Sequence, residues 1–215
     1  VDEGRVSLED QVTVSPRAAS MGGSQAFLDA GERYKLSELL KTVIVASAND
    51  SAVALAEHLA GTEESFVRLM NTRAEELGLT NTHYANCTGL PAQEHYTTAR
   101  DVAKLSAQLD LHPLYYRYST IWMDEIRHRG GRVTALTNTN RLVRFYPGCD
   151  GYKTGSTNEA RYCISATAKK DGMRLIAVVL GTPAGQTRFD EARAMLEYGF
   201  ANVKLTTPIA QGQPL

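Results

Sequence analysis

The chain has 215 residues, of which 43% are hydrophobic and 22% charged, values typical of a globular domain with a core of its own. Its 23 Lys and Arg residues balance 24 Asp and Glu residues, which argues against a basic nucleic-acid-binding protein and an acidic tail protein. The longest aliphatic run, residues 175–180, is too short to span a bilayer.

The first half of the chain is predicted to be mainly helical. Apolar side chains recur at helical spacing after Ser37, the expected N-cap, and a polar break at 47–51 separates this helix from a second that closes at Gly61. Thr98 and Asp101 stand in capping-box spacing near the start of a later helix. The other elements predicted in this half are a strand at 12–14, a glycine-rich loop at 20–24, and helices at 62–78, 97–109 and 114–122.

The second half is predicted to be an antiparallel hairpin followed by a helix. Residues 149–157 turn and then extend, and Asp171-Gly172 forms a tight turn between strands at 161–168 and 173–180. An amphipathic helix is expected at 186–198. This order of elements indicates an α+β fold in which helices pack against an antiparallel sheet.

The two ends of the chain suggest an interior piece of a longer protein. The pattern of Val1 to Gly4 is typical of the last residues of a helix that ends at a glycine cap. The Pro- and Gly-containing residues 208–215 are typical of the start of a linker. We therefore expect a truncated domain over 1–204 and the start of a linker over 205–215.

No metal or organic cofactor is indicated. Three cysteines (Cys87, Cys149 and Cys163) cannot all pair internally, and no C-x-x-C spacing suggests a zinc cage or a redox pair. The signatures G-x-G-x-x-G, Walker A, H-E-x-x-H and G-x-S-x-G are also absent.

Two short motifs carry the chemistry, and each also has a plain structural explanation. Ser47-Ala48-Asn49 is an S-x-N triplet between two helices, where Asp50 or Ser51 could simply cap the second helix. Lys153-Thr154-Gly155 is a K-T-G triplet at a strand, where a lysine could merely discourage edge pairing. The triplets lie 106 residues apart (153 − 47), an arrangement typical of serine acyl-transferases that use S-x-x-K, S-x-N and K-T-G.

Seven segments of the chain, taken in order, carry a family resemblance. They are Gly22–Ser24, Val45–Glu57, Thr82–Asn86, Gly89–Leu90, His95–Asp101, Gly151–Thr157 and Asp171–Gly181. Together they resemble D-alanyl-D-alanine carboxypeptidases, the low-molecular-mass penicillin-binding proteins of bacteria, over essentially the whole chain. The resemblance implies the α+β transpeptidase fold that this family shares with β-lactamases, with a helical subdomain beside an antiparallel sheet flanked by helices.

One family motif is missing from this sequence. Family members carry S-x-x-K shortly before the residues that match Val1 to Gly4, whereas none of the twelve serines here has a lysine three positions later. The resemblance places the nucleophilic serine and its activating lysine upstream of Val1, so the chain by itself is predicted to be inert. Truncation explains this better than degeneration, which would be expected to erode Ser47, Asn49 and Lys153 as well.

The resemblance assigns the S-x-N triplet to proton transfer and substrate binding. It implies a serine-type carboxypeptidase that removes the terminal D-alanine from peptidoglycan stem peptides through an acyl-enzyme. The Ser47 hydroxyl would relay a proton toward the departing D-alanine. The Asn49 amide can donate to the substrate's backbone carbonyl and accept from a neighbouring lysine.

The K-T-G segment is assigned to recognition of the substrate's free carboxylate. Lys153 would supply positive charge, Thr154 would hydrogen-bond the carboxylate, and Gly155 would let the substrate backbone approach closely. The Ser156 amide would be one oxyanion donor. Arg188 resembles a family arginine near the carboxylate, with an ordinary surface arginine as the alternative.

Four further residues beside these motifs have open roles. Cys149, Tyr152 and Asn158 could line the cleft or only pack beside it. Arg161 stands where the family commonly has glycine.

Two rival functions remain open at this point. A β-lactamase on the same fold would need a second general base, but no E-x-x-L-N segment lies between the triplets. A catalytically dead peptidoglycan-binding scaffold would explain the missing S-x-x-K, but not the intact S-x-N and K-T-G. The expected partners are stem peptides ending in D-Ala-D-Ala and β-lactam antibiotics, at an extracytoplasmic location. Membrane association is expected only through a C-terminal anchor that this sequence lacks.

Overall fold

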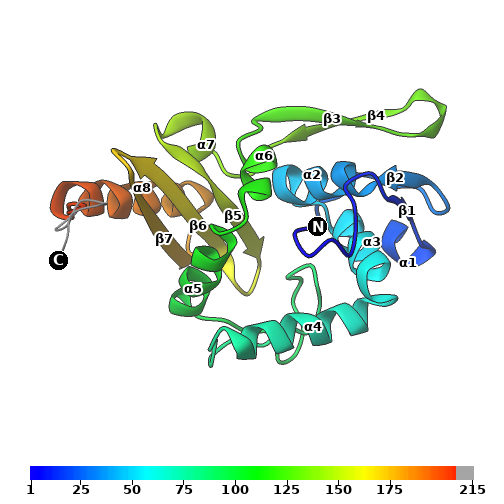
Figure 1. Cartoon of the computed structure of the whole chain (residues 1–215), viewed down its shortest axis with the longest axis horizontal. Helices are drawn as coiled ribbons and strands as arrows, with labels where there is room; N and C mark the ends of the chain where they lie inside the picture. Colours follow the sequence, from blue (N-terminus) through cyan, green and yellow to red (C-terminus); the bar gives the residue numbers. More distant parts are fainter. Residues whose placement is uncertain (207–215) are drawn as a thin grey trace, which may run out of the picture.

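A group of helices and a three-stranded sheet stand side by side in the structure, a computed structural model that describes residues 1–206 (Figure 1). The helices are α1 (Pro16–Ala19), α2 (Leu36–Ala46), α3 (Asn49–Ala60), α4 (Glu63–Glu76), α5 (Ala99–Leu109), α6 (Tyr116–Ser119), α7 (Leu142–Phe145) and α8 (Gly185–Asn202). The strands are β1 (Gln11–Thr13), β2 (Arg33–Lys35), β3 (Met123–Arg127), β4 (Val133–Thr137), β5 (Cys149–Thr157), β6 (Arg161–Lys170) and β7 (Met173–Thr182). This arrangement confirms the predicted α+β class.

The main sheet has the antiparallel order β5-β6-β7. The predicted hairpin is confirmed, because Asp171 and Gly172 both have positive φ (49° and 80°), as a tight turn between twisted strands requires. Side chains alternate across β6, so that Ile164 packs in the cluster with α8 whereas Ser165 bonds to Ser106 of α5 on the other face. Helices therefore cover both faces of the sheet, and β5 is left at its edge beside the helical group.

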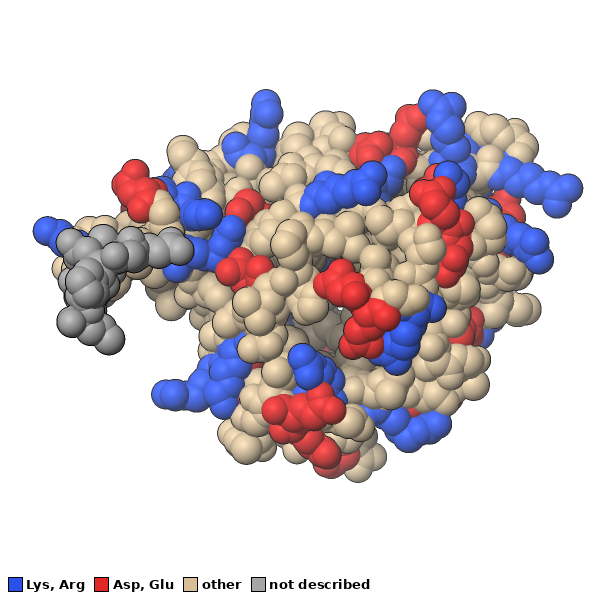
Figure 2. All heavy atoms as spheres, in the orientation of Figure 1, with Lys and Arg blue, Asp and Glu red and all other residues tan. Residues whose placement is uncertain are grey.

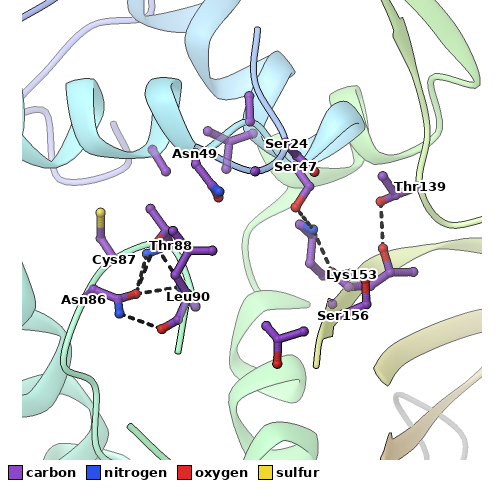
Figure 3. A pocket seen from close by; sticks show the side chains of 18 of the residues that line it. Ser24, Ser47, Asn49, Asn86, Cys87, Thr88, Leu90, Thr139, Lys153 and Ser156 are labelled. Atoms are coloured by element: carbon purple, nitrogen blue, oxygen red, sulfur yellow. Dashed lines mark hydrogen bonds between the residues drawn. The ribbon is translucent and has the colours of Figure 1, made fainter. Parts of the chain in front are cut away.

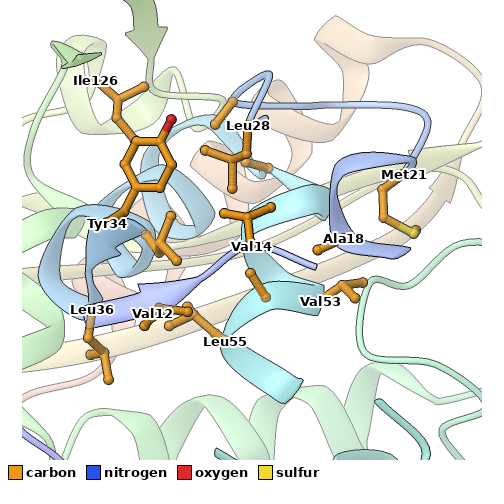
Figure 4. Packing of buried hydrophobic residues seen from close by; sticks show 14 of the residues in the cluster. Val12, Val14, Ala18, Met21, Leu28, Tyr34, Leu36, Val53, Leu55 and Ile126 are labelled. Carbon is orange, nitrogen blue, oxygen red and sulfur yellow. The ribbon is translucent and has the colours of Figure 1, made fainter. Parts of the chain in front are cut away.

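Two separate apolar clusters hold the fold together. The first joins β1 and β2 to α2, α3 and the β3–β4 hairpin, and Figure 4 shows its side chains converging from these elements. The second joins the main sheet to α7 and α8. Its fully or almost fully buried members include Ile164, Ala166, Ala192 and Leu196. Burial of this kind contributes about 25 cal/mol per Å² of apolar surface, so each cluster stabilises its own part of the molecule.

The boundaries of the first two long helices differ from the prediction. Pairing of Lys35 with Gln11 keeps residue 35 extended, so α2 begins at Leu36 and Ser37 is not its N-cap. The break between α2 and α3 is only two residues long, and α3 begins at Asn49. Neither Asp50 nor Ser51 caps α3.

Several predicted elements need correction. The chain over 114–122 is a 3₁₀ turn and the short α6 instead of one helix, and residues 1–4 form a turn without a helix. The β3–β4 hairpin was missed, although Gly130-Gly131, both at positive φ, marks its turn. The expected linker at 205–215 falls largely on residues 207–215, which lie outside the described part of the chain. Within residues 1–206, every helix is too short or too polar to cross a membrane.

Candidate active site

A cleft of about 690 Å³ lies where the α2–α3 turn faces β5, with the segment 84–95 forming a third wall. Figure 3 shows Ser47 and Asn49 on one side and Lys153 and Ser156 on another. All seven residues predicted for the site line this cleft: Ser47, Asn49, Lys153, Thr154, Gly155, Ser156 and Arg188.

The charged side chains that line this cleft are all cationic. Lys153 and Arg188 line it, whereas none of its lining residues in the described chain is Asp or Glu. On the outer face seen in Figure 2, by contrast, acidic and basic side chains are interspersed. A cleft lined by two cationic side chains in a nearly neutral protein favours an anionic ligand.

The two motifs meet in a direct hydrogen bond. Lys153 Nζ donates to Ser47 Oγ at 2.6 Å and to the Thr154 carbonyl at 2.8 Å. Ser47 occupies the left-handed region (φ 61°, ψ 36°) at the end of α2, and this turn directs its side chain toward β5. A left-handed non-glycine residue costs about 1 kcal/mol or more, so the surrounding fold holds this orientation in place.

The environment of Lys153 lowers the pKa of its ammonium group. Burial, together with the nearby charge of Arg188, lowers the pKa of Lys153 to about 8. A lysine with such a pKa exchanges protons readily near neutral pH, in contrast to a surface lysine. It can therefore supply a positive charge or take part in proton transfer with the Ser47 hydroxyl.

Asn49 is held by the glycine-rich loop that precedes α2. Its backbone N–H donates to Ser24 O at 2.8 Å, and its side-chain Nδ2 donates to Gly22 O at 2.8 Å. Gly23 cannot be replaced freely, because it has a φ of +79° and a Cβ there would lie 2.8 Å from Asn49 Nδ2. The predicted contact of this amide with a lysine is not seen among the described residues.

Buried Asp50 anchors the same loop from the next position of α3. Its carboxylate accepts hydrogen bonds from the backbone N–H groups of Ala26, Leu28 and Ser51, at 2.8–3.1 Å. Such charge-assisted bonds are strong, so the loop and Asn49 are fixed as one unit.

The residues after Lys153 continue along the edge strand β5. Thr154 is buried, and its hydroxyl donates to Thr139 Oγ1 at 2.8 Å. Gly155 and Ser156 are exposed, and nothing lies within 4 Å of a Cβ built on Gly155. The strand is therefore open to the cleft at these two residues.

Arg188, on the first turn of α8, closes the end of the cleft. Its Nη1 donates to Gly155 O at 3.0 Å and to Cys163 O at 3.4 Å, and its guanidinium stacks over the rings of Tyr162 and Phe189. Its Nε is buried without a hydrogen-bond partner among the described residues. Arg188 thus lines the cleft and is held there by the backbone of β5 and β6.

The cleft has lining residues that the sequence did not indicate, and the residues whose roles were left open lie outside it. Thr139 and His95 line it, yet neither was predicted; the two asparagines that flank Thr139 were the available signal. Cys149 and Tyr152 are buried and do not line the cleft: Cys149 packs in the second apolar cluster, and the Tyr152 ring packs against Tyr115 and Tyr116. Asn158 lines a neighbouring pocket together with Arg161, whose φ is 56°.

The fold and this combination of hydroxyl, lysine and amide define the class of serine acyl-transferases that carry S-x-N and K-T-G motifs. The sequence profile of the D-alanyl-D-alanine carboxypeptidase family matches residues 1–184. The chain belongs to this family.

Individual relatives agree with this assignment. The chain is 44% identical to the D-alanyl-D-alanine carboxypeptidase DacF of Bacillus subtilis over 201 residues, which cover 94% of this chain and 52% of that protein. It is 39% identical to DacC of Escherichia coli over 212 residues (95% and 52%). The chain thus spans about half the length of these curated relatives.

Solved structures share the fold. The D-alanyl-D-alanine carboxypeptidase DacD from Francisella tularensis matches with a TM-score of 0.88 at 31% identity, covering 93% of this chain and 60% of that one. The Streptomyces K15 DD-transpeptidase matches with a TM-score of 0.85 at 29% identity, covering 92% and 81%. These similarities confirm the fold expected from the sequence.

Proposed function

We propose that the protein containing this chain is a serine-type carboxypeptidase that removes the terminal D-alanine from peptidoglycan stem peptides. The observation that carries the proposal is the 2.6 Å hydrogen bond from Lys153 to Ser47 inside a cleft lined by cations. It joins the two motifs that the family uses for acyl transfer.

In the proposed reaction, a serine oxygen bonds to the carbonyl carbon between the two D-alanines, and the C–N bond breaks. Water then hydrolyses the resulting ester. The serine and its lysine base belong to the S-x-x-K motif, which we place outside the printed sequence. Ser47 passes a proton to the departing amine, assisted by Lys153 with its pKa of about 8.

The specificity for a chain terminus is attributed to the carboxylate of the last D-alanine. Thr154 donates a hydrogen bond to it, and Lys153 and Arg188 supply the compensating charge. The Asn49 amide donates to a backbone carbonyl of the peptide, and the Ser156 amide serves as an oxyanion donor. The exposed backbone of Gly155 leaves room for an extended peptide beside β5.

Three further parts of the proposal concern the whole protein. Residues 1–204 form a truncated catalytic domain, and 205–215 begin a linker to a C-terminal β-rich domain. The protein acts outside the cytoplasmic membrane and is attached to it by an anchor. Penicillins acylate the complete enzyme, whereas the 215-residue chain alone is inert.

The test is the intact mass of the protein before and after incubation with penicillin. We expect no adduct on the 215-residue chain and one stable adduct on the full-length protein, which should also release D-alanine from an acetylated Lys-D-Ala-D-Ala peptide. An adduct on the short chain would contradict the placement of the nucleophile and make Ser47 the first suspect. Rapid penicillin turnover would favour a β-lactamase, and a full-length protein without adduct or peptide cleavage would favour a binding scaffold.

A further inference from the structure

We propose that Thr139 is a positioning residue that orients the Thr154 hydroxyl for the substrate's terminal carboxylate. The inference rests on the proposed function and deepens it. Thr139 belongs to none of the recognised motifs, yet its hydroxyl lies 2.8 Å from that of Thr154 and lines the same cleft (Figure 3).

Thr139 lies in a segment that is hydrogen-bonded to three other parts of the chain. Its backbone N–H donates to Val45 O at 3.0 Å, two residues before Ser47. Asn138 Nδ2 donates to Ser119 O and Ile121 O at 2.9 and 2.8 Å. On the other side, Asn140 Nδ2 donates to the β5 backbone at 3.1 Å. The segment 138–140 thus connects the end of α2 to β5, and the backbone of Thr139 is fixed between them.

The role of Thr139 follows from the number of donors and acceptors on the Thr139 and Thr154 hydroxyls. Each hydroxyl has one proton to donate and two lone pairs that accept. In the structure, the Thr154 hydroxyl donates its proton to Thr139 Oγ1. A carboxylate has no proton to give, so when it binds, Thr154 must turn its proton toward it. Thr139 can then donate its own proton to Thr154 Oγ1.

This exchange keeps the Thr154 hydroxyl hydrogen-bonded in both states. Because Thr154 is buried, loss of its partner would leave a polar atom unsatisfied or let the side chain rotate its methyl group toward the ligand. The consequence should fall on binding of the carboxylate, since the hydrogen bond that the Thr139 hydroxyl makes among the described residues is the one with Thr154.

The experiment compares Thr139→Val and Thr139→Ser in the full-length protein, with release of D-alanine from acetylated Lys-D-Ala-D-Ala as the assay. Valine keeps the volume but removes the hydroxyl, whereas serine keeps the hydroxyl. We expect Thr139→Val to raise KM about tenfold with kcat changed by less than about threefold, and Thr139→Ser to restore KM. Thr137→Val, two residues away on exposed β4, is the matched control.

A second measurement separates this inference from the proposed function. Calorimetric binding of the same peptide and of its C-terminal amide is compared between Ser47→Ala and Ser47→Ala/Thr139→Val, because an active enzyme would cleave the peptide during the titration. We expect the double variant to lose about tenfold in affinity for the carboxylate peptide but little for the amide. Equal losses for both peptides, no change, or a fall in kcat alone would overturn the role of Thr139. A wild type that binds the carboxylate peptide but releases no D-alanine would refute only the proposed reaction.

Discussion

Replacement of Lys153 by methionine tests whether the folded protein lowers the pKa of this lysine. The folded state lowers the pKa of Lys153 to about 8 from an ordinary 10.5, because burial disfavours its charge. Between these two pKa values the unfolded chain binds more protons than the folded chain, so the lysine makes stability rise with pH. Integrated from about pH 7 to about pH 9.5, this amounts to about 2 kcal/mol, all of which Lys153→Met should remove.

The assay is urea unfolding of the 215-residue chain and its variant at both pH values. The stability of the wild type relative to Lys153→Met should increase by about 2 kcal/mol on going to the higher pH. The difference in unfolding free energy between the two proteins removes the contribution of tyrosines and cysteines, because these residues are the same in both. Lys169→Met, at an exposed lysine, is the control and should show no such change. If the difference in unfolding free energy between wild type and variant does not change with pH, the lowered pKa of Lys153 is refuted, and so is its proposed part in proton transfer.

Three further outcomes are expected. Asp50→Ala should destabilise the chain by at least about 3 kcal/mol in urea unfolding, because it leaves three backbone N–H groups without their acceptor; a loss below about 1 kcal/mol would contradict the anchoring role. Gly23→Ala should cost about 1–3 kcal/mol through its positive φ and its clash with Asn49, whereas Gly22→Ala, with open space around it, should stay within about 0.5 kcal/mol. Ser47→Ala in the full-length protein should slow D-alanine release at least about 100-fold while leaving the protein folded, and near-normal turnover would exclude a proton relay.

The elements that sequence could predict are those whose signals are local. The β6–β7 hairpin carries its turn chemistry in Asp171-Gly172, and α4 carries its N-cap in Thr62, whose side chain accepts from Ser65 N. The start of α2 was misplaced because strand pairing at Lys35, a contact distant in sequence, sets it. Local propensity contains no information about that pairing.

The same distinction applies to the site. Ser47, Asn49 and Lys153 could be predicted because they stand in motifs with known chemistry, and the structure brings all three to one cleft. Thr139 could not, since its importance depends on the hydrogen bond to Thr154 across the cleft wall. For Cys149 and Tyr152 the sequence left both a cleft-lining and a packing role open, because proximity in sequence to a motif does not specify which way a side chain points; the structure shows packing.

The position of the cleft between two separate cores also has a consequence for folding. Ser47 belongs to the part built on the first apolar cluster and Lys153 to the part built on the second, and their contact closes a loop of 106 residues. Contacts of such long sequence separation form late, after most of the chain entropy has been lost. The hydrogen bond between Lys153 and Ser47 should therefore be among the last native contacts to appear and, under mild denaturant, among the first to be lost. Variants that only loosen the docking of the two cores would then abolish activity while secondary structure and most of the measured stability remain.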